Sequence, residues 1–101
     1  MLVIAGHFRI DAARKPVAEL AAREMMRATR REPGCLAYVF SCDLDEPELF
    51  HLFEAWESPS ALEAHFRTAH MAAFQKAVAG FGVKDSKIER YEVASVGPVR
   101  G

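Results

Sequence analysis

The sequence predicts a small α+β protein whose elements follow the order β-α-β-β-α-β. Three observations lead to this prediction. The chain has 101 residues, too few for a second hydrophobic core, so one domain is expected. β-prone segments alternate with segments whose apolar residues recur at helical spacing. Proline and glycine stand at the boundaries between these segments.

The first strand is expected over residues 2–10, where a continuous apolar run passes into alternation. A polar connection over residues 11–15 leads to a helix from Pro16 to about Arg31. Proline fits the first turn of a helix, because its missing N–H has no partner there. The Pro-Gly pair at residues 33–34 ends this helix.

The middle of the chain predicts an antiparallel hairpin. Residues 36–43 and 49–57 are rich in aromatic and β-branched side chains, which is typical of strands. The segment between them, residues 44–47, has the sequence Leu-Asp-Glu-Pro and favours a turn. Strands joined by a short loop of this kind pair with each other.

The last third predicts a helix and a final strand. Ser58 can cap a helix that begins at Pro59 and continues to Gly80. Residues 81–86 are expected as a loop and 87–96 as the last strand. We expect one domain over residues 1–97, with residues 98–101 as a flexible C-terminal tail. The order is that of the ferredoxin-like fold, four antiparallel strands with two helices on one face.

The third strand has apolar side chains on both of its faces. Phe50, Leu52 and Trp56 share one face, and Leu49 and Phe53 share the other. Helices cover only one face of such a sheet, so the other face needs a second cover. A second copy of the chain is the simplest source of it, which predicts a homodimer.

Composition excludes several classes of protein. The 13 basic and 14 acidic residues give a net charge of -1, which argues against a nucleic-acid partner. No apolar run reaches about 18 residues, so no membrane span is expected. No secretory signal pattern is present, and a cytoplasmic location is the simplest interpretation. Phosphate-loop, HExxH, GxSxG and dinucleotide motifs are absent, so no cofactor is predicted.

Glu54 and Trp56 stand out because they share an apolar strand face. A carboxylate there must find a partner or take a raised pKa. Glu54 is therefore either a proton acceptor in a pocket or a structural group paired with Arg9, Arg90 or the backbone. Trp56 is either an anchor of the core or a pocket wall against which an aromatic substrate could stack.

Histidines provide the other candidates. His65 flanks the apolar stripe of the second helix. It is either a pocket histidine, whose ordinary pKa suits proton transfer, or a structural histidine whose hydrogen bonds are satisfied within the protein. His70, five residues later, is about 140° away around a continuous helix. The two cannot then share one ion, so no metal site is predicted. His70 favours a structural role near a helix kink, and His7 on the first strand is a third candidate.

The segment from Glu32 to Phe74 resembles the antibiotic biosynthesis monooxygenase family. Glu-Pro-Gly-Cys at residues 32–35 precedes a strand, Glu54-x-Trp56-x-Ser58 ends the next, and a His-x-x-Thr-x-His motif at residues 65–70 lies on the second helix. Length and element order fit over about 90 residues. The nearest match is the quinol-monooxygenase-like group.

The resemblance implies a ferredoxin-like fold, a homodimer whose sheets form an α/β-barrel, and a pocket between sheet and helices. It implies a cofactor-independent monooxygenase that uses molecular oxygen to convert a small phenol or hydroquinone into a quinone. By this analogy His65 is the base, Trp56 the wall and Glu54 the orienting group. Substrate-binding residues are then expected at His7, Leu52, Leu62, Phe66 and His70.

The chain departs from two branches of that family. Leu52 stands where the quinone-forming antibiotic branch tends to have an asparagine. The haem-degrading branch uses an asparagine, a tryptophan and a histidine at positions nearest to His7, His65 and Gln75 here, so its triad is absent. Two alternatives stay open: an isomerase of a small oxygenated metabolite, and a non-catalytic module that binds a small aromatic.

Overall fold

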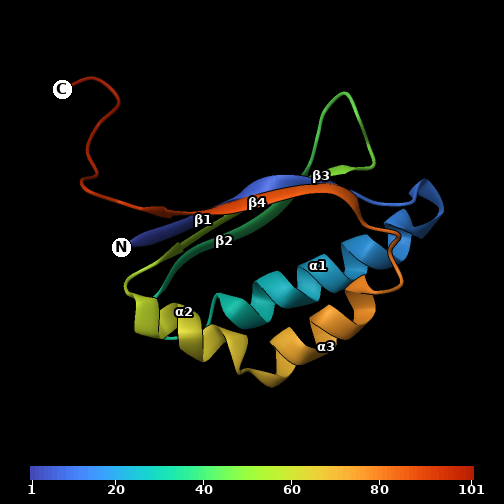
Figure 1. Cartoon of the computed structure of the whole chain (residues 1–101), viewed down its shortest axis with the longest axis horizontal. Coiled ribbons are helices and arrows are strands. Elements are labelled where there is room, and N and C mark those ends of the chain that lie inside the picture. Colours follow the sequence, from blue (N-terminus) through green and yellow to red (C-terminus); the bar gives the residue numbers. More distant parts are fainter.

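The strands form one antiparallel sheet, and the helices lie together on one of its faces (Figure 1). The computed structural model describes all 101 residues. The sheet order is β2-β3-β1-β4, which is the predicted ferredoxin-like arrangement. The elements are β1 (Leu2–Arg9), the 3₁₀ turn η1 (Ala12–Arg14), α1 (Lys15–Thr29), β2 (Cys35–Cys42), β3 (Leu49–Trp56), α2 (Pro59–Phe66), α3 (Ala69–Val78) and β4 (Lys84–Glu92). No helix is both long and apolar enough to cross a membrane.

The first three strands match the predicted segments to within one residue at each end, but the prediction for β4 was wrong at both ends. β4 begins at Lys84, opposite Arg9 of β1, and ends at Glu92, opposite Leu2. Leu2 is the first residue of β1, and past it only one further backbone hydrogen bond to β1's side is made, from the Val93 N–H to the Met1 carbonyl at 3.1 Å. Residues 93–101 contain no helix or strand.

The second predicted helix is in fact two helices. α2 ends at Phe66 and α3 begins at Ala69. Thr68 separates them with an extended backbone, and its hydroxyl accepts a hydrogen bond from the Met71 N–H at 3.2 Å, which caps α3. The same hydroxyl donates to the His65 carbonyl at 2.8 Å, which satisfies the end of α2. Thr68 therefore stabilises a bend that helical periodicity alone does not reveal.

The hydrophobic core lies between the sheet and the helices. Alternate residues of the strands point toward the helices, as the apolar pattern predicted. The core cluster consists of Leu2, Phe8, Ile10, Ala18, Ala22, Met25, Tyr38, Phe40, Phe50, Leu52, Trp56, Leu62 and Phe81. Full burial of one large apolar side chain contributes about 1.5–3 kcal/mol, so this layer dominates the stability of the fold.

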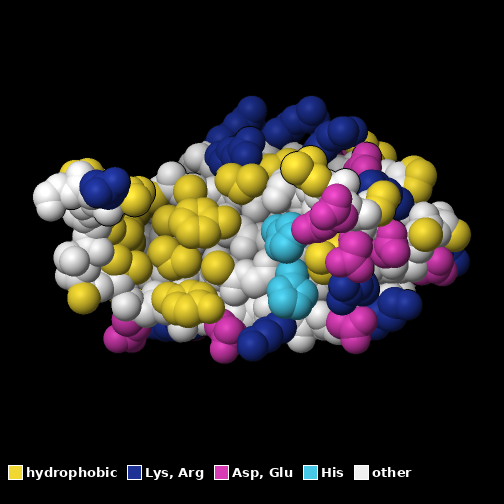
Figure 2. All heavy atoms as spheres, turned by 90° about the horizontal axis from the view of Figure 1, so that it is seen from above, with side chains coloured by type: hydrophobic (Ala, Val, Ile, Leu, Met, Phe, Trp, Pro, Cys, Tyr) yellow, Lys and Arg dark blue, Asp and Glu magenta, His cyan; other side chains and the backbone are white.

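The other face of the sheet carries no helix. Seen from above, it shows a patch of apolar side chains next to histidine and acidic groups (Figure 2). Val39 of β2 is paired with Phe53 of β3, and Val3 of β1 with Tyr91 of β4. Val39, Phe53 and Tyr91 are all exposed. The sheet is therefore apolar on both faces, as the pattern of the third strand predicted.

Gly6 allows β4 to lie close against β1. A Cβ atom at this position would meet the Lys87 carbonyl oxygen at 2.0 Å and the Ile88 Cα at 2.6 Å. Both obstacles are backbone atoms and cannot rotate away. The pairing of β1 with β4 therefore requires glycine at position 6.

Candidate functional site

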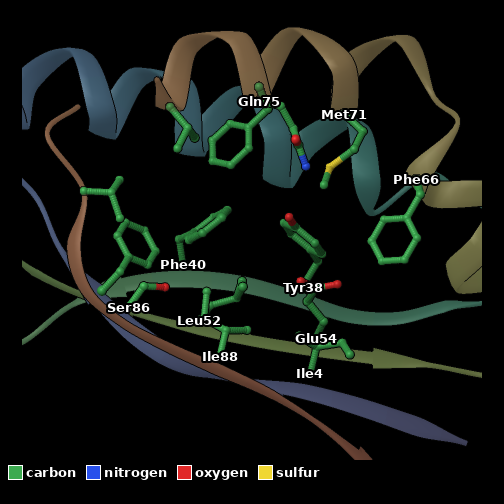
Figure 3. Close-up of a pocket in the computed structure, with 14 residues that line it drawn as sticks. Ile4, Tyr38, Phe40, Leu52, Glu54, Phe66, Met71, Gln75, Ser86 and Ile88 are labelled. Atoms are coloured by element: carbon green, nitrogen blue, oxygen red, sulfur yellow. The ribbon is translucent and has the colours of Figure 1, made fainter. Parts of the chain in front are cut away.

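A cavity of about 410 Å³ lies between the sheet and α3 (Figure 3). This volume is within the range of small-molecule sites. The lining residues are Ile4, Phe8, Tyr38, Phe40, Leu52, Glu54, Phe66, Met71, Phe74, Gln75, Val78, Val83, Ser86 and Ile88. Eleven of these 14 are hydrophobic, so the cavity suits a ligand with a large apolar or aromatic surface.

Few polar groups reach this cavity, and they come from different elements. Glu54 on β3 and Tyr38 on β2 are direct cross-strand partners, so they lie side by side on the sheet. Gln75 on α3 faces them from the helix layer, and Ser86 lies on β4 (Figure 3). A ligand between sheet and helix therefore meets a carboxyl group and a phenol on one side and an amide on the other.

Glu54 is the carboxyl group of the cavity, and its environment alters its pKa. Burial raises its pKa from the ordinary value of 4.5 to about 7, although a hydrogen bond from Trp56 lowers it and the charge of Glu32 raises it. For Tyr38, burial and then the neighbouring Glu54 charge raise the pKa above its ordinary value, so the phenol stays neutral. The cavity thus contains a carboxyl group that changes charge near neutral pH next to a permanent hydroxyl donor.

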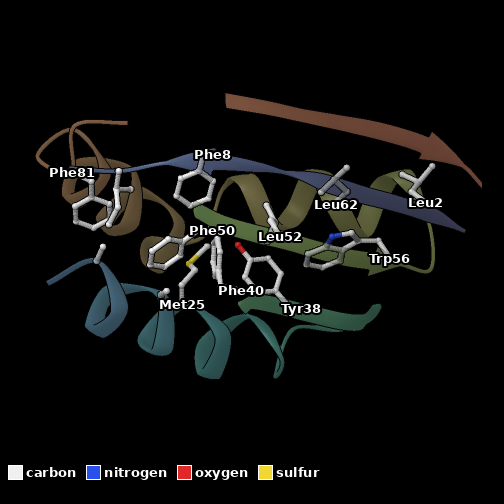
Figure 4. Close-up of a cluster of buried hydrophobic side chains, with 13 residues drawn as sticks. Leu2, Phe8, Met25, Tyr38, Phe40, Phe50, Leu52, Trp56, Leu62 and Phe81 are labelled. Carbon is white, nitrogen blue, oxygen red and sulfur yellow. The ribbon is translucent and has the colours of Figure 1, made fainter. Parts of the chain in front are cut away.

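Trp56, His65 and Leu62 lie behind the cavity and do not line it. All three are nearly inaccessible to solvent, and Trp56 and Leu62 belong to the core cluster (Figure 4). The rings of Trp56 and His65 are in contact, with centroids 4.8 Å apart. The indole Nε1 donates to Glu54 Oε1 at 2.9 Å. These residues support the carboxyl group from the core side.

Glu32 joins the two histidines of the helix region. Its Oε2 is 2.8 Å from His65 Nδ1 and 2.6 Å from His70 Nε2. The expected separation of about 140° between these histidines was wrong, because it assumed a continuous helix. The bend at Thr68 changes the direction of the chain between them and brings both imidazoles to one carboxylate.

His7 lies on the open face of the sheet, away from the cavity. Its cross-strand partner is His51, and the two ring centroids are 6.3 Å apart. Both line a shallow depression on that face together with Lys87, Glu89 and Tyr91. The structure therefore does not bring His7 together with the other predicted site residues.

Among the predicted site residues, the structure places Glu54, Leu52 and Phe66 around the cavity. Sequence reasoning missed Tyr38 and Gln75 as site residues. Tyr38 could have been found from the hairpin register, because it is opposite Glu54. Gln75 carried a weaker signal: it follows Met71 by four residues, so both occupy one face of α3. Ser86 carried none, because it was expected in a loop.

The family model for antibiotic biosynthesis monooxygenase matches residues 1–77 of this chain. A solved structure from Deinococcus radiodurans, assigned to the antibiotic biosynthesis monooxygenases, has a TM-score of 0.90 at 28% identity and covers 100% of both chains. Another with the same assignment, from Nitrosomonas europaea, has a TM-score of 0.87 at 24% identity. It covers 94% of this chain and 100% of its own, and at that identity it supports the fold alone.

A curated relative, the uncharacterized protein sll1783 of Synechocystis, is 29% identical over 93 residues. The match includes 92% of this chain but only 63% of that protein. The chain therefore spans less than two thirds of the length of this relative.

Proposed function

This chain belongs to the antibiotic biosynthesis monooxygenase family, and from that premise we propose that it oxidises a small phenol or hydroquinone to a quinone. The oxidant is molecular oxygen, and no cofactor takes part. One observation carries the proposal: the carboxyl group of Glu54, with a pKa of about 7, opens into an apolar cavity of about 410 Å³. Oxygenation of this kind needs a base, a dry aromatic pocket and donors for a developing oxyanion.

The first step is proton transfer. The Glu54 carboxylate accepts the hydroxyl proton of the phenol, and the resulting phenolate is electron-rich enough to pass an electron to oxygen. A new C–O bond then forms at a ring carbon, and the O–O bond breaks. One oxygen atom becomes the second quinone carbonyl. The other leaves as water with two hydrogens, one from the attacked ring carbon and one the hydroxyl proton that Glu54 returns. A hydroquinone treated in the same way gives a hydroxyquinone and water.

Tyr38 and Gln75 provide the donors in this proposal. The Tyr38 hydroxyl stays protonated because burial and the Glu54 charge raise its pKa. The Gln75 amide faces it across the cavity (Figure 3). Together they hold the substrate oxygen where negative charge develops, and this stabilises the transition state more than the neutral phenol. Leu52 supplies an apolar wall.

The role of base, expected for His65 by analogy, belongs to Glu54 in this proposal. His65 is 1% exposed and does not line the cavity. It packs against Trp56, which donates its hydrogen bond to Glu54. We assign Trp56 and His65 as positioning residues that hold the carboxyl group in place.

Oxygen consumption with a panel of hydroquinones and naphthols tests the proposal. We expect uptake above the autoxidation background, and a loss of about 10²–10⁴-fold in kcat for Glu54→Gln, the usual contribution of a general base. Glu63→Gln is the matched control, because Glu63 is exposed on α2. With ¹⁸O₂ the quinone should gain one labelled oxygen atom.

Three results would contradict the proposal. Uptake no greater than autoxidation, together with tight binding of the same compounds, would indicate a non-catalytic binding module. Unlabelled quinone with hydrogen peroxide would indicate an oxidase in place of a monooxygenase. Full activity in Glu54→Gln would remove Glu54 from the chemistry.

The proposal includes a homodimer formed through the open face of the sheet. Val39, Phe53 and Tyr91 form an exposed apolar patch on that face (Figure 2). Exposed patches of this kind are typical of interaction surfaces. A second copy of the chain would cover the patch and join the two sheets back to back, which leaves the cavity of each chain on the outer side, beneath its own helices.

We also propose a cytoplasmic location. Cys35 and Cys42 are both free thiols, and both are partly buried. Unpaired thiols are stable in a reducing compartment and are uncommon where disulfides form.

A further inference from the structure

We propose that Glu32, His65 and His70 bind one divalent transition-metal ion, with Zn²⁺ as the best fit. One carboxylate oxygen and two imidazole nitrogens converge here, and these three ligand atoms lie within 4.8 Å of one another. Two histidines and one glutamate are a ligand set that holds zinc in proteins while leaving an open coordination position. The site lies outside the cavity, and it shares one residue with the proposed function, His65, which packs against Trp56 behind Glu54.

The charge of Glu32 favours a cation at this point. Its side chain is only 11% exposed, and its ion-pair partners are these two imidazoles, with no lysine or arginine among them. A buried carboxylate requires compensation by positive charge. Histidine binds a metal as the neutral imidazole, so this ligand set would bring one negative charge to a divalent cation.

The distances are compatible with an ion after a small adjustment. The carboxylate oxygen is now 2.8 Å and 2.6 Å from the two nitrogens. Ligand atoms about 2.0–2.1 Å from a tetrahedral zinc are separated by roughly 3.3–3.4 Å. The ion would replace both hydrogen bonds, with the oxygen moving away from the two nitrogens and the nitrogens, which lie within 4.8 Å of each other, moving closer together. His70 is 29% exposed, so it can move, and it gives the ion access from solvent.

The surroundings already hold the ligands in place. His65 is fixed by contact with the Trp56 ring and by the hydrogen bond from Thr68 to its carbonyl oxygen. Thr68 also caps α3, so it determines where His70, the second residue of that helix, is placed. Rigid outer contacts of this kind orient metal ligands and raise their affinity.

Zinc binding to the full chain, after removal of metals by a chelator, tests the site. Isothermal titration with Zn²⁺ should give one ion per chain, and Zn²⁺ should raise the Tm of the wild type. His70→Ala should weaken binding by more than the roughly 10–100-fold that loss of an outer partner costs. Because Glu32→Gln removes the charge, it should have at least as large an effect. If His70→Ala folds poorly, His70→Gln is used in its place, because the glutamine amide can still donate a hydrogen bond to Glu32.

His51→Ala is the matched control. His51 also pairs with a carboxylate, Asp43, at 2.9 Å, and its ring is 6.3 Å from that of His7, close to the 6.1 Å between His65 and His70. Zinc binding should be unchanged in this variant. Nitrogen-15 NMR of the imidazoles should show the ion on Nδ1 of His65 and Nε2 of His70.

Absence of stoichiometric binding would overturn the proposal, and so would binding that His70→Ala leaves intact or His51→Ala removes. This readout is independent of oxygen consumption. A chain that binds zinc but oxidises nothing would support the metal site and contradict the proposed function, and the reverse result would do the opposite.

Discussion

Trp56 Nε1 donates a hydrogen bond of 2.9 Å to Glu54 Oε1, two residues earlier on the same face of β3. This bond is buried, and it connects the carboxyl group in the cavity to Trp56 in the hydrophobic core. It lowers the pKa of Glu54, but desolvation raises the pKa by more. The chemistry of the cavity therefore depends on a balance between these opposing effects.

The raised pKa of Glu54 predicts how stability changes with pH. Below about pH 4.5 the carboxyl group is protonated in both folded and unfolded chains, and its stabilising contribution is fully present. As pH rises through the folded pKa of about 7, that contribution is lost, by about 3 kcal/mol at most. Glu54→Gln does not titrate. Its free energy of unfolding, relative to the wild type, should therefore increase between pH 4.5 and pH 8 in urea denaturation.

The control for this experiment is Glu63→Gln, in which the substituted group is exposed on α2. It should show the same difference from the wild type at both pH values. If the difference in free energy of unfolding between Glu54→Gln and the wild type were also the same at both pH values, the carboxyl group would be solvated in the folded chain.

Trp56→Phe keeps an aromatic ring but removes the indole donor. Because that hydrogen bond lowers the pKa of Glu54, its loss should raise this pKa further, by about one unit for a bond to a charged group. The acidic limb of the kcat/KM profile against pH should move upward by the same amount. Phe81→Leu, at the opposite end of the core, should lower stability and leave the profile in place (Figure 4). An unshifted profile in Trp56→Phe would show that the bond does not tune the base.

The homodimer predicts a mass of twice the chain mass of 11.2 kDa in sedimentation at micromolar concentration. Phe53→Glu places a charge in the exposed patch and should give monomers, because an unpaired charge at a buried interface is costly. Phe66→Glu makes the same change on the helix side, where Phe66 is 52% exposed, and should leave the dimer intact. A wild-type monomer would contradict the proposed assembly.

Gly6→Ala should destabilise the chain by about 3 kcal/mol, the upper end for an overpacked site, because the new methyl group meets the backbone of β4. Gly97→Ala is the control, since a Cβ there has nothing within 4 Å. Midpoints of urea unfolding measure both. Equal midpoints for the two variants would mean that β4 can move away from β1 without loss.

Much of the fold could be predicted because local patterns agree with one another. Alternation placed Phe50, Leu52 and Trp56 together on one face of the third strand, and the structure has all three in the core beneath the helices. The hairpin followed from the turn at residues 44–47. The end of β4 could not be predicted, because it depends on the position of Leu2, the first residue of its partner strand β1.

The candidate site was less predictable, because it depends on contacts between distant segments. Glu54 was recognised from a carboxylate on an apolar face. The contact of Glu32 with His65 and His70 was not, since it spans 33 and 38 residues and requires the bend at Thr68. Periodicity assumes an unbroken helix, and the cap that Thr68 provides in the middle of the predicted helix violates that assumption.

The bend at Thr68 also makes the helical wall of the cavity a separate element of the chain. Glu54 and Tyr38 belong to the hairpin, but Met71, Phe74 and Gln75 lie on α3, a separate helix with its own cap. Substitutions on α3 change the helical wall of the cavity, and Glu54 stays on the sheet. Under the proposed function, exchange of the ten-residue α3 segment should therefore change which rings the cavity accepts.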